Sequence, residues 1–412
     1  MSKLLSSYEG VVGSAVLRQL RQLGEKLAGT RIVHVNSTRE GGGVAEILEW
    51  MVPLMNDLGL RASWEVIHGD PRFFEITKSV HNGLQGYSVP LSGKDWKIFE
   101  DVNARNFERL RPALEEADVV VIHDPQPAGL LKLCERRKGK WIWRAHIDIS
   151  RPFRPVWKAL RPFVEKFDAS IFSMAEFAQL LPHPQFLIPP SIDPLSEKNR
   201  DLEPSEIEAV RAEYGLDPSR PLLVQVSRFD RFKDPVGVIA AYRMVRKVAP
   251  VQLVLAGGGA TDDPEGKAVL DDVLEAAGND PDIHVLLLPP DAHRTINALQ
   301  RLADVVIQKS TKEGFGLTVT EGMWKGKPVV GGDVGGIRLQ VVNHHTGFLV
   351  NTPEGAAHRI RYFLHNRARL EEMGSIARSL VRENFLLTRH LRDYLTMMLA
   401  MARDPRARLV QV

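Results

Sequence analysis

Cysteine is almost absent from this chain, since Cys134 is the single one among 412 residues. One thiol excludes an intramolecular disulfide and a cysteine-rich metal site. Long apolar runs are also missing, and none approaches the roughly 18–20 residues of a membrane-spanning helix. The N-terminal segment lacks the continuous apolar core of a secretory signal peptide, so we expect a cytoplasmic protein.

Charge of one sign is nowhere concentrated. Lys and Arg together number 54 and Asp and Glu 51, which leaves a net charge of +3. No stretch dense in Lys and Arg is interleaved with aromatic residues, so no nucleic-acid partner is expected. The mild positive balance suits an anionic small molecule better.

A strand–loop–helix alternation runs along the whole chain. The run Arg31–Asn36 is rich in β-branched residues, and a helical apolar pattern follows it. Near-continuous apolar strands that alternate with helices indicate parallel sheets covered on both faces, which is an α/β fold. Further strands are predicted at Ser63–Ile67, Val119–His123, Trp141–Ile147, Ala169–Ser173 and Phe186–Pro189, and later in the segments PLLVQVSRFD, VQLVLAGGG, IHVLLLPP, ADVVIQKS and KPVVGGD.

The length is that of two domains, and the Pro- and Ser-rich segment 189–206 is typical of a linker. We predict an N-terminal domain over residues 1–200 and a C-terminal domain over residues 201–385. The final segment, 386–412, begins with an amphipathic helix that must pack, and we expect it to cross back to the N-terminal domain. In parallel sheets, ligands bind beyond the carboxyl ends of the strands, so residues there are the candidates for a site.

Two short motifs follow strands. Gly41–Gly43 come after the first strand and open a helix, so the backbone there could approach a phosphate closely. A tight strand-to-helix turn is the alternative. In SRFDRFKD, Arg228 and Lys233 could stabilise the charge on a departing diphosphate. A solvated basic turn is the alternative.

The sharpest motif is KEGFGLTVTEGMW. Gly314 and Gly316 leave backbone N–H groups accessible at a helix N-terminus, which favours an anion. Glu313 comes before the turn and Glu321 inside the helix, so the two carboxylates could hold different hydroxyl pairs of one sugar-containing ligand. As acid and nucleophile of a glycosidase they would have to flank one glycosidic bond, and their separation by a turn and a helix disfavours that.

Together, E-G-F-G-L-x-x-x-E, S-R-F-x-x-x-K and the glycine loop resemble the retaining glycosyltransferases of family 4 over essentially the whole chain. The resemblance implies a GT-B fold, in which two Rossmann-like parallel-sheet domains face each other across a cleft. It also implies a histidine near the anomeric carbon, at His146, for which a packed strand-end imidazole is the alternative. The implied catalytic residues are Arg228, Lys233, Glu313 and His146, and the implied donor-binding residues are Gly42, Gly43, Gly314, Phe315, Gly316, Leu317 and Glu321.

The segments HVNSTREGGGVAEIL, HNGLQG, VIHDPQPAGL, WRAHIDIS and IPPSIDPLSEKN more closely resemble the trehalose glycosyltransferring synthases, with Lys312 where Arg is more common. That resemblance implies reversible transfer of glucose from a nucleoside diphosphate glucose to the anomeric hydroxyl of free glucose, giving α,α-trehalose. The implied partners are the nucleotide sugar and glucose or trehalose. Retaining trehalose phosphorylases share similar segments, so cleavage of trehalose by phosphate stays open.

The acceptor is expected on polar residues of the N-terminal domain. Asp124 and Gln126 follow a strand in HDPQP, and Arg144 and Asp148 in WRAHID add to the same wall. Asn82 is expected in a glycine-punctuated loop that closes over that wall. The alternative for Asp124 is a turn or helix cap.

No obligatory cofactor and no metal ligand are predicted. The acidic pair Asp262-Asp263 is the candidate for a metal site, but adjacent carboxylates in such a loop are usually solvated. In GT-B enzymes cations and helix ends take the place of the metal, so Mg²⁺ is expected only as a counterion of the nucleotide. The residues do not choose between UDP-, ADP- and GDP-glucose. A homodimer and a non-catalytic nucleotide-sugar-binding module stay open, whereas no membrane partner is expected.

Overall fold

The computed structural model describes residues 3–39, 42–258, 264–403 and 409–411. The chain packs as two compact units: unit 1 comprises Met1–Ser191 and Leu387–Val412, and unit 2 comprises Ile192–Leu386. The chain enters and leaves unit 2 side by side, because the backbone N–H of Ile192 donates to the carbonyl of Phe385 at 2.9 Å. The sequence had suggested boundaries at residues 200 and 385.

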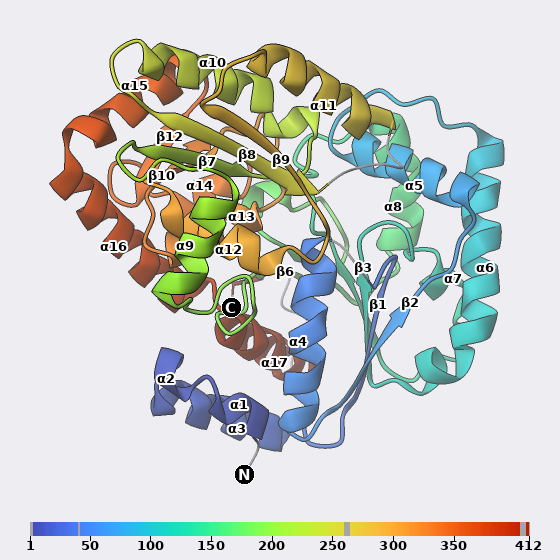
Figure 1. Ribbon diagram of the computed structural model, residues 1–412. Helices are drawn as coiled ribbons and strands as arrows, with labels where there is room; N and C mark the ends of the chain where they lie inside the picture. The colour runs from blue at the N-terminus through green and yellow to red at the C-terminus, as the bar shows by residue number, and fades with distance from the viewer. Residues whose placement is uncertain (1–2, 40–41, 259–263, 404–408, 412) are drawn as a thin grey trace. The chain divides into compact units, whose positions relative to one another are not determined.

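Unit 1 contains a parallel sheet in the order β13-β6-β5-β4-β3-β1-β2. The strands predicted at Arg31–Asn36 and Val119–His123 form over those residues, and the other strands predicted in this unit form with shifted ends. The strand order reverses between β1 and β3, and such a switch point is where ligands bind in open α/β sheets. Figure 1 labels β1, β2, β3 and β6 of this sheet. The strands are β1 (Arg31–Asn36), β2 (Arg61–Val66), β3 (Val119–His123), β4 (Lys140–Arg144), β5 (Ala169–Phe172), β6 (Gln185–Leu187) and β13 (Leu409–Gln411).

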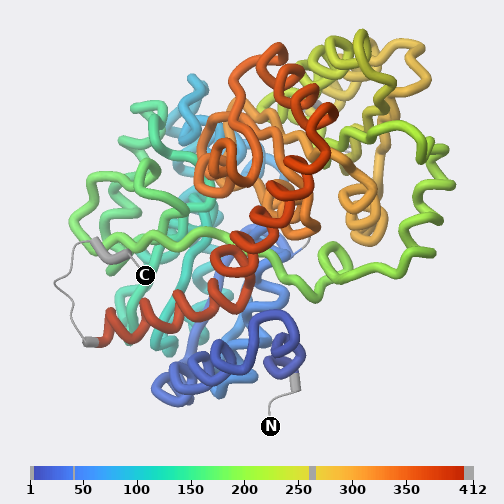
Figure 2. The backbone as a smooth tube through the Cα atoms, turned by 90° about the vertical axis from the view of Figure 1, so that its left-hand side faces the viewer, coloured from blue at the N-terminus to red at the C-terminus, as the bar shows by residue number. Residues whose placement is uncertain are grey.

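Each face of this sheet carries its own apolar layer, because successive strand residues point to opposite faces. Val120 and Ile122 pack with residues of α5, α6 and α8, whereas Val119 and Val121 pack with residues of α3, α4 and α17. Figure 2 shows α17 alongside the N-terminal helices, and residues of α17 and α3 share one apolar layer. The helices of unit 1 are α1 (Lys3–Ser6), α2 (Glu9–Val12), α3 (Ser14–Lys26), α4 (Gly43–Asp57), α5 (Pro71–Leu84), α6 (Gly93–Glu116), α7 (Leu130–Leu133), α8 (Arg154–Val164), the 3₁₀ turn η1 (Ala175–Phe177) and α17 (Leu387–Arg403).

Unit 2 contains a second parallel sheet, in the order β12-β11-β10-β7-β8-β9. Numbered within the unit, this is the Rossmann order, and its switch point lies between β7 and β10. The two predicted Rossmann-like parallel-sheet domains are therefore confirmed. The strands are β7 (Leu222–Val226), β8 (Gln252–Gly258), β9 (Ile283–Leu288), β10 (Val305–Gln308), β11 (Val329–Gly332) and β12 (Gly347–Val350).

One face of the second sheet is covered by α10, α11 and α15, whose apolar residues share a core cluster with Leu223, Leu253 and Ile307 of the strands. Among the residues that the structure describes, no helix is long and apolar enough to span a membrane. The helices of unit 2 are α9 (Pro204–Glu213), the 3₁₀ turn η2 (Arg231–Lys233), α10 (Pro235–Arg246), α11 (Pro264–Ala277), α12 (His293–Leu302), α13 (Leu317–Trp324), α14 (Ile337–Gln340), α15 (Pro353–His365) and α16 (Arg367–Asn384).

Candidate functional site

Two predicted residues meet at the switch point of unit 2. Lys233 follows β7 and Glu313 follows β10, and the Lys233 Nζ lies 2.6 Å from the Glu313 Oε2. The same carboxylate oxygen accepts a hydrogen bond from the Ser310 hydroxyl at 3.1 Å. Only 9% of the Glu313 side chain and 19% of the Lys233 side chain are exposed. The structure thus joins two residues that the sequence assigned to different parts of one ligand.

The backbone around Lys233 is held in an uncommon conformation. Asp234 has φ of 47°, in the left-handed region, which costs a residue other than glycine about 1–3 kcal/mol. Its carboxylate caps α10 by accepting from the Gly237 N–H at 3.1 Å, and it forms an ion pair with the buried Lys309. The Gln225 side chain donates to the Lys233 carbonyl at 2.8 Å. These contacts fix the backbone at Lys233, and the ion pair with Glu313 holds its side chain.

Arg228 differs from Lys233 in its environment. Its side chain is 74% exposed, and its Nη2 lies 3.8 Å from the Asp230 Oδ2, which is a loose ion pair. Such a pair contributes little to stability. The Arg228 side chain can therefore change its orientation at small cost, whereas the Lys233 side chain is held by its ion pair with Glu313.

A glycine turn precedes α13, as the sequence predicted. Gly316 has φ of +87° and is the N-cap of α13, with no side-chain cap. Phe315 is buried and its ring lies 5.6 Å from that of Phe385, so only its backbone is available to a ligand. Gln340 donates to the Phe315 carbonyl at 2.6 Å and fixes the turn. Leu317 is the first residue of the helix.

Glu321 lies within α13 and is 1% exposed. Its Oε2 accepts from the Gln300 side chain at 3.2 Å, and its Oε1 lies 3.8 Å from the Lys198 Nζ. Lys325, one turn later, is buried and donates to the Glu321 carbonyl at 3.3 Å and to the Asn199 Oδ1 at 3.0 Å. Burial lowers the pKa of Lys325 to about 7. The carboxylate of Glu321 is therefore fixed by neighbours that the sequence motif did not indicate.

In unit 1, Asp124 follows β3 at the switch point between β1 and β3. Its φ is 64°, again left-handed, and its N–H donates to the Arg144 carbonyl at 2.8 Å. The Asp124 Oδ1 accepts from the backbone N–H of His146 at 2.8 Å. Burial raises the pKa of the Asp124 carboxyl to about 6. Burial, with a smaller contribution from the Arg144 cation, lowers the pKa of His146 well below the ordinary value. Asp124 and His146 are thus held together at one edge of the sheet.

The other predicted acceptor residues differ in accessibility. Gln126 and Asp148 are partly exposed, and the Asp148 Oδ1 accepts from the Ser150 N–H at 2.9 Å. Arg144 is completely buried, and no described residue forms a hydrogen bond with its guanidinium group. Its side chain therefore lies beneath the surface instead of lining an open wall.

The prediction that Asn82 lies in a loop is wrong, because Asn82 is within α5 (Pro71–Leu84). Asp70 caps the N-terminus of this helix. Gly83, which suggested a loop, is required by packing: a Cβ there would lie 2.6 Å from the Val156 Cγ2. A close approach between two elements, and not a turn, explains that glycine.

The glycine loop of unit 1 is described in part. Gly42 has φ of +85° and is the N-cap of α4, which begins at Gly43. Gly41, Asp262 and Asp263 lie outside the described residues. Within the described ranges, no group of three or more His, Cys, Asp or Glu side chains could hold a metal ion.

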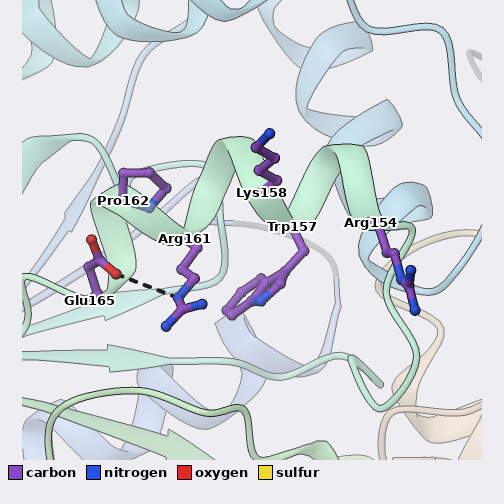
Figure 3. Close-up of a pocket in the computed structure, with 6 residues that line it drawn as sticks. All are labelled: Arg154, Trp157, Lys158, Arg161, Pro162 and Glu165. Atoms are coloured by element: carbon purple, nitrogen blue, oxygen red, sulfur yellow. Dashed lines mark ion pairs between the residues drawn. The ribbon is translucent and has the colours of Figure 1, made fainter.

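A surface pocket of about 320 Å³ lies along α8 in unit 1 (Figure 3). The Arg161 Nε lies 3.5 Å from the Glu165 Oε2 at one end of it. No predicted site residue is among those that line it, so it is separate from the candidate site. The lining residues are Arg154, Trp157, Lys158, Arg161, Pro162 and Glu165.

The fold and the motif-bearing loops define a glycosyltransferase of the GT-B type, and residues 206–380 match the family described as glycosyl transferases group 1. Residues 34–179 match the family described as trehalose synthase, N-terminal domain. The trehalose synthase of Thermococcus litoralis is 47% identical over 96% of this chain and 97% of its own length. The chain belongs to the trehalose synthase family, whose chemistry is trehalose-related glycosyl transfer.

More distant proteins share parts of this likeness. The trehalose phosphorylase of Pleurotus sajor-caju is 28% identical over 91% of this chain but only 58% of its own length. The solved structure of an E. coli trehalose-6-phosphate protein, with UDP-2-fluoro glucose bound, has a TM-score of 0.74 and 14% identity. It covers 90% of this chain and 99% of its own. At that identity the likeness shows the fold alone.

Proposed function

We propose that this protein transfers glucose, with retention of configuration, from a nucleoside diphosphate glucose to the anomeric hydroxyl of free glucose, giving α,α-trehalose reversibly. The observation that carries the proposal is the Lys233–Glu313 pair at the switch point of unit 2, with 2.6 Å between Nζ and Oε2. It provides a cation for a phosphate and a carboxylate for sugar hydroxyls in one place. The full-length likeness to trehalose synthases supports trehalose as the product.

On the donor side, Lys233 and Arg228 would bind the diphosphate and stabilise the charge that develops as its bond to glucose breaks. The N-terminus of α13, opened by Gly316, would add backbone donors to the same anion. Glu313 would accept hydrogen bonds from donor-glucose hydroxyls. Glu321, whose carboxylate Gln300 already orients, would accept from the ribose hydroxyls.

On the acceptor side, unit 1 would hold glucose through Asp124, Gln126 and Asp148, with His146 near the anomeric carbon. The left-handed φ of Asp124 supports this assignment, because backbone strain of this kind concentrates at functional sites. Asn82, which lies within a helix, would contact the acceptor only from that fixed position.

Transfer with retention needs either a carboxylate nucleophile or attack from the leaving-group side. We infer front-side attack through an oxocarbenium-like state, in which the departing β-phosphate oxygen takes the proton of the acceptor hydroxyl. The protein then contributes mainly position and charge stabilisation, and positioning alone can supply about 7–11 kcal/mol. No resident metal is needed, and Mg²⁺ would act as a counterion of the nucleotide.

The test is a donor–acceptor matrix. UDP-, ADP- and GDP-glucose are each incubated with glucose, with and without EDTA, while released nucleotide is measured and the disaccharide is identified by NMR. An α,α-1,1-linked product that the Glu313→Gln variant does not make supports the proposal. If no donor gives a disaccharide but trehalose and phosphate give glucose 1-phosphate, the protein is a phosphorylase and the proposal is wrong.

A further inference from the structure

Three imidazole rings of unit 1 form a continuous hydrogen-bonded chain. His34 on β1, His123 at the end of β3 and His146 after β4 come from three neighbouring strands. The His34 Nδ1 lies 3.0 Å from the His123 Nε2, and the His123 Nδ1 lies 2.9 Å from the His146 Nε2. His146 is partly exposed, so its remaining ring nitrogen, Nδ1, is the one left for a ligand.

Burial favours the uncharged form of all three rings. Burial is the largest cause that lowers each pKa: that of His34 falls to about 3, and those of His123 and His146 fall well below the ordinary value. A neutral imidazole carries one N–H and one bare nitrogen, so it donates once and accepts once. His123 uses both nitrogens within the chain, and therefore both hydrogen bonds must run in the same direction.

Only two proton arrangements satisfy this chain. In the first, the Nδ1–H of His34 donates to His123 and the Nδ1–H of His123 donates to His146, so the proton of His146 is on Nδ1. In the second, every bond is reversed and the Nδ1 of His146 is bare. The tautomer of His34, which lies at the buried end of the chain, therefore decides whether His146 presents a donor or an acceptor.

The environment of His34 favours the first arrangement. His34 is 0% exposed, and no described residue forms a hydrogen bond with its Nε2. The second arrangement would bury an N–H at that position without an acceptor, and buried N–H groups without partners are rarer than under-satisfied acceptors. The first arrangement leaves only a bare nitrogen there.

We propose that His34 and His123 are positioning residues that hold His146 in the Nδ1-protonated tautomer, so that His146 presents a ring N–H to a sugar hydroxyl oxygen. This inference rests on the proposed function for the identity of the ligand, but the tautomer itself does not depend on it. An uncharged donor also suits the reaction, since an imidazolium would repel the positive charge that develops on the transferred glucose.

The first experiment needs no substrate. Long-range ¹H–¹⁵N correlation spectra of the full-length protein, labelled at histidine, report which ring nitrogen carries the proton. We expect the His146 and His123 signals to show a protonated Nδ1 and a bare Nε2, and the His146 signal of His34→Leu to show a mixture of tautomers. A protonated Nε2 on His146 in the unaltered protein, or an unchanged tautomer in His34→Leu, overturns the inference.

The second experiment measures turnover. His34→Leu is expected to lower kcat about tenfold, with KM for the donor unchanged. His34→Asn, whose amide can donate to the His123 Nε2, is expected to recover most of the loss. Exposed His358→Leu is the matched control and should have no effect. If His34→Asn and His34→Leu lose the same amount of turnover and are equally destabilised in thermal unfolding, His34 is only a core residue and the inference fails. Absence of trehalose formation in the unaltered protein refutes only the proposed function.

Discussion

Replacing Lys233 by Met tests the donor site most directly. The substitution leaves the Glu313 carboxylate, 9% exposed, without its ion-pair partner, and of the contacts described above only that from Ser310 at 3.1 Å remains. Breaking a buried pair by removing one partner costs about 3–5 kcal/mol. Because Lys233 keeps 19% of its side chain exposed, we expect a loss near the lower end, about 3 kcal/mol in the free energy of unfolding.

The same substitution removes a preorganised cation from the departing diphosphate. Loss of one such donor lowers kcat by roughly 100- to 1,000-fold, which corresponds to about 2.7–4 kcal/mol. Urea unfolding followed by circular dichroism measures the first effect, and steady-state kinetics of nucleotide release measures the second.

A double variant separates stability from catalysis. In Lys233→Met with Glu313→Gln no carboxylate is left unpaired, so much of the stability should return while turnover stays low. Lys97→Met is the matched control, because Lys97 pairs with Asp101 on the surface at 2.8 Å with 70% and 48% of the side chains exposed. It should leave the urea midpoint unchanged. Near-normal turnover in Lys233→Met, or recovered turnover in the double variant, would refute the assignment of Lys233 to the phosphate.

Three further predictions concern other described residues. Arg228→Ala should lower kcat/KM for the donor about 10- to 100-fold, as expected for a charge-assisted hydrogen bond, while the urea midpoint stays unchanged because the side chain is 74% exposed. Burial raises the pKa of Asp124 to about 6, so kcat/KM for glucose should fall as the pH drops through about 6 and the carboxylate is protonated. Asp124→Asn should have a low kcat/KM for glucose that does not fall further in this range. A fall of the same size in Asp124→Asn would contradict the assignment. Lys325 has a folded pKa of about 7 and an unfolded one of 10.5, so the unfolded chain binds more protons between these values and stability rises with pH there. From pH 7 to pH 9 the free energy of unfolding should gain about 2 kcal/mol relative to Lys325→Met, and equal pH profiles in urea unfolding would contradict this.

Several features of the fold could be predicted because their causes are local. The apolar run Val119–His123 formed the predicted strand, and the helix predicted after the Gly314–Gly316 turn begins at Leu317. The Asn82 prediction failed because Gly83 was interpreted as a turn residue, whereas it accommodates Val156 on another helix. No local pattern distinguishes a glycine needed for backbone conformation from one needed for close packing.

The residues that support the site were missed for a related reason. Asp234 and Lys309 form an ion pair across 75 residues of sequence. Asp234 ends the SRFDRFKD motif but was not singled out there, and Lys309 lies outside the motifs that indicated the donor site. A weak signal existed for His34, since it is a polar residue inside an apolar strand that ends at the switch point. That signal alone does not distinguish a site residue from a core histidine whose hydrogen bonds are satisfied.

The sequence by itself determined the two parallel-sheet units and the residue types at the strand ends, because strand and helix periodicity and glycine chemistry act over a few residues. Only the tertiary structure decided which of these side chains meet. Lys233 and Glu313 are 80 residues apart, and His34 and His123 are 89 apart, yet each pair is within hydrogen-bonding distance. The order of strands in each sheet brings them together. That order depends on packing between segments far apart in the sequence, which local patterns do not specify.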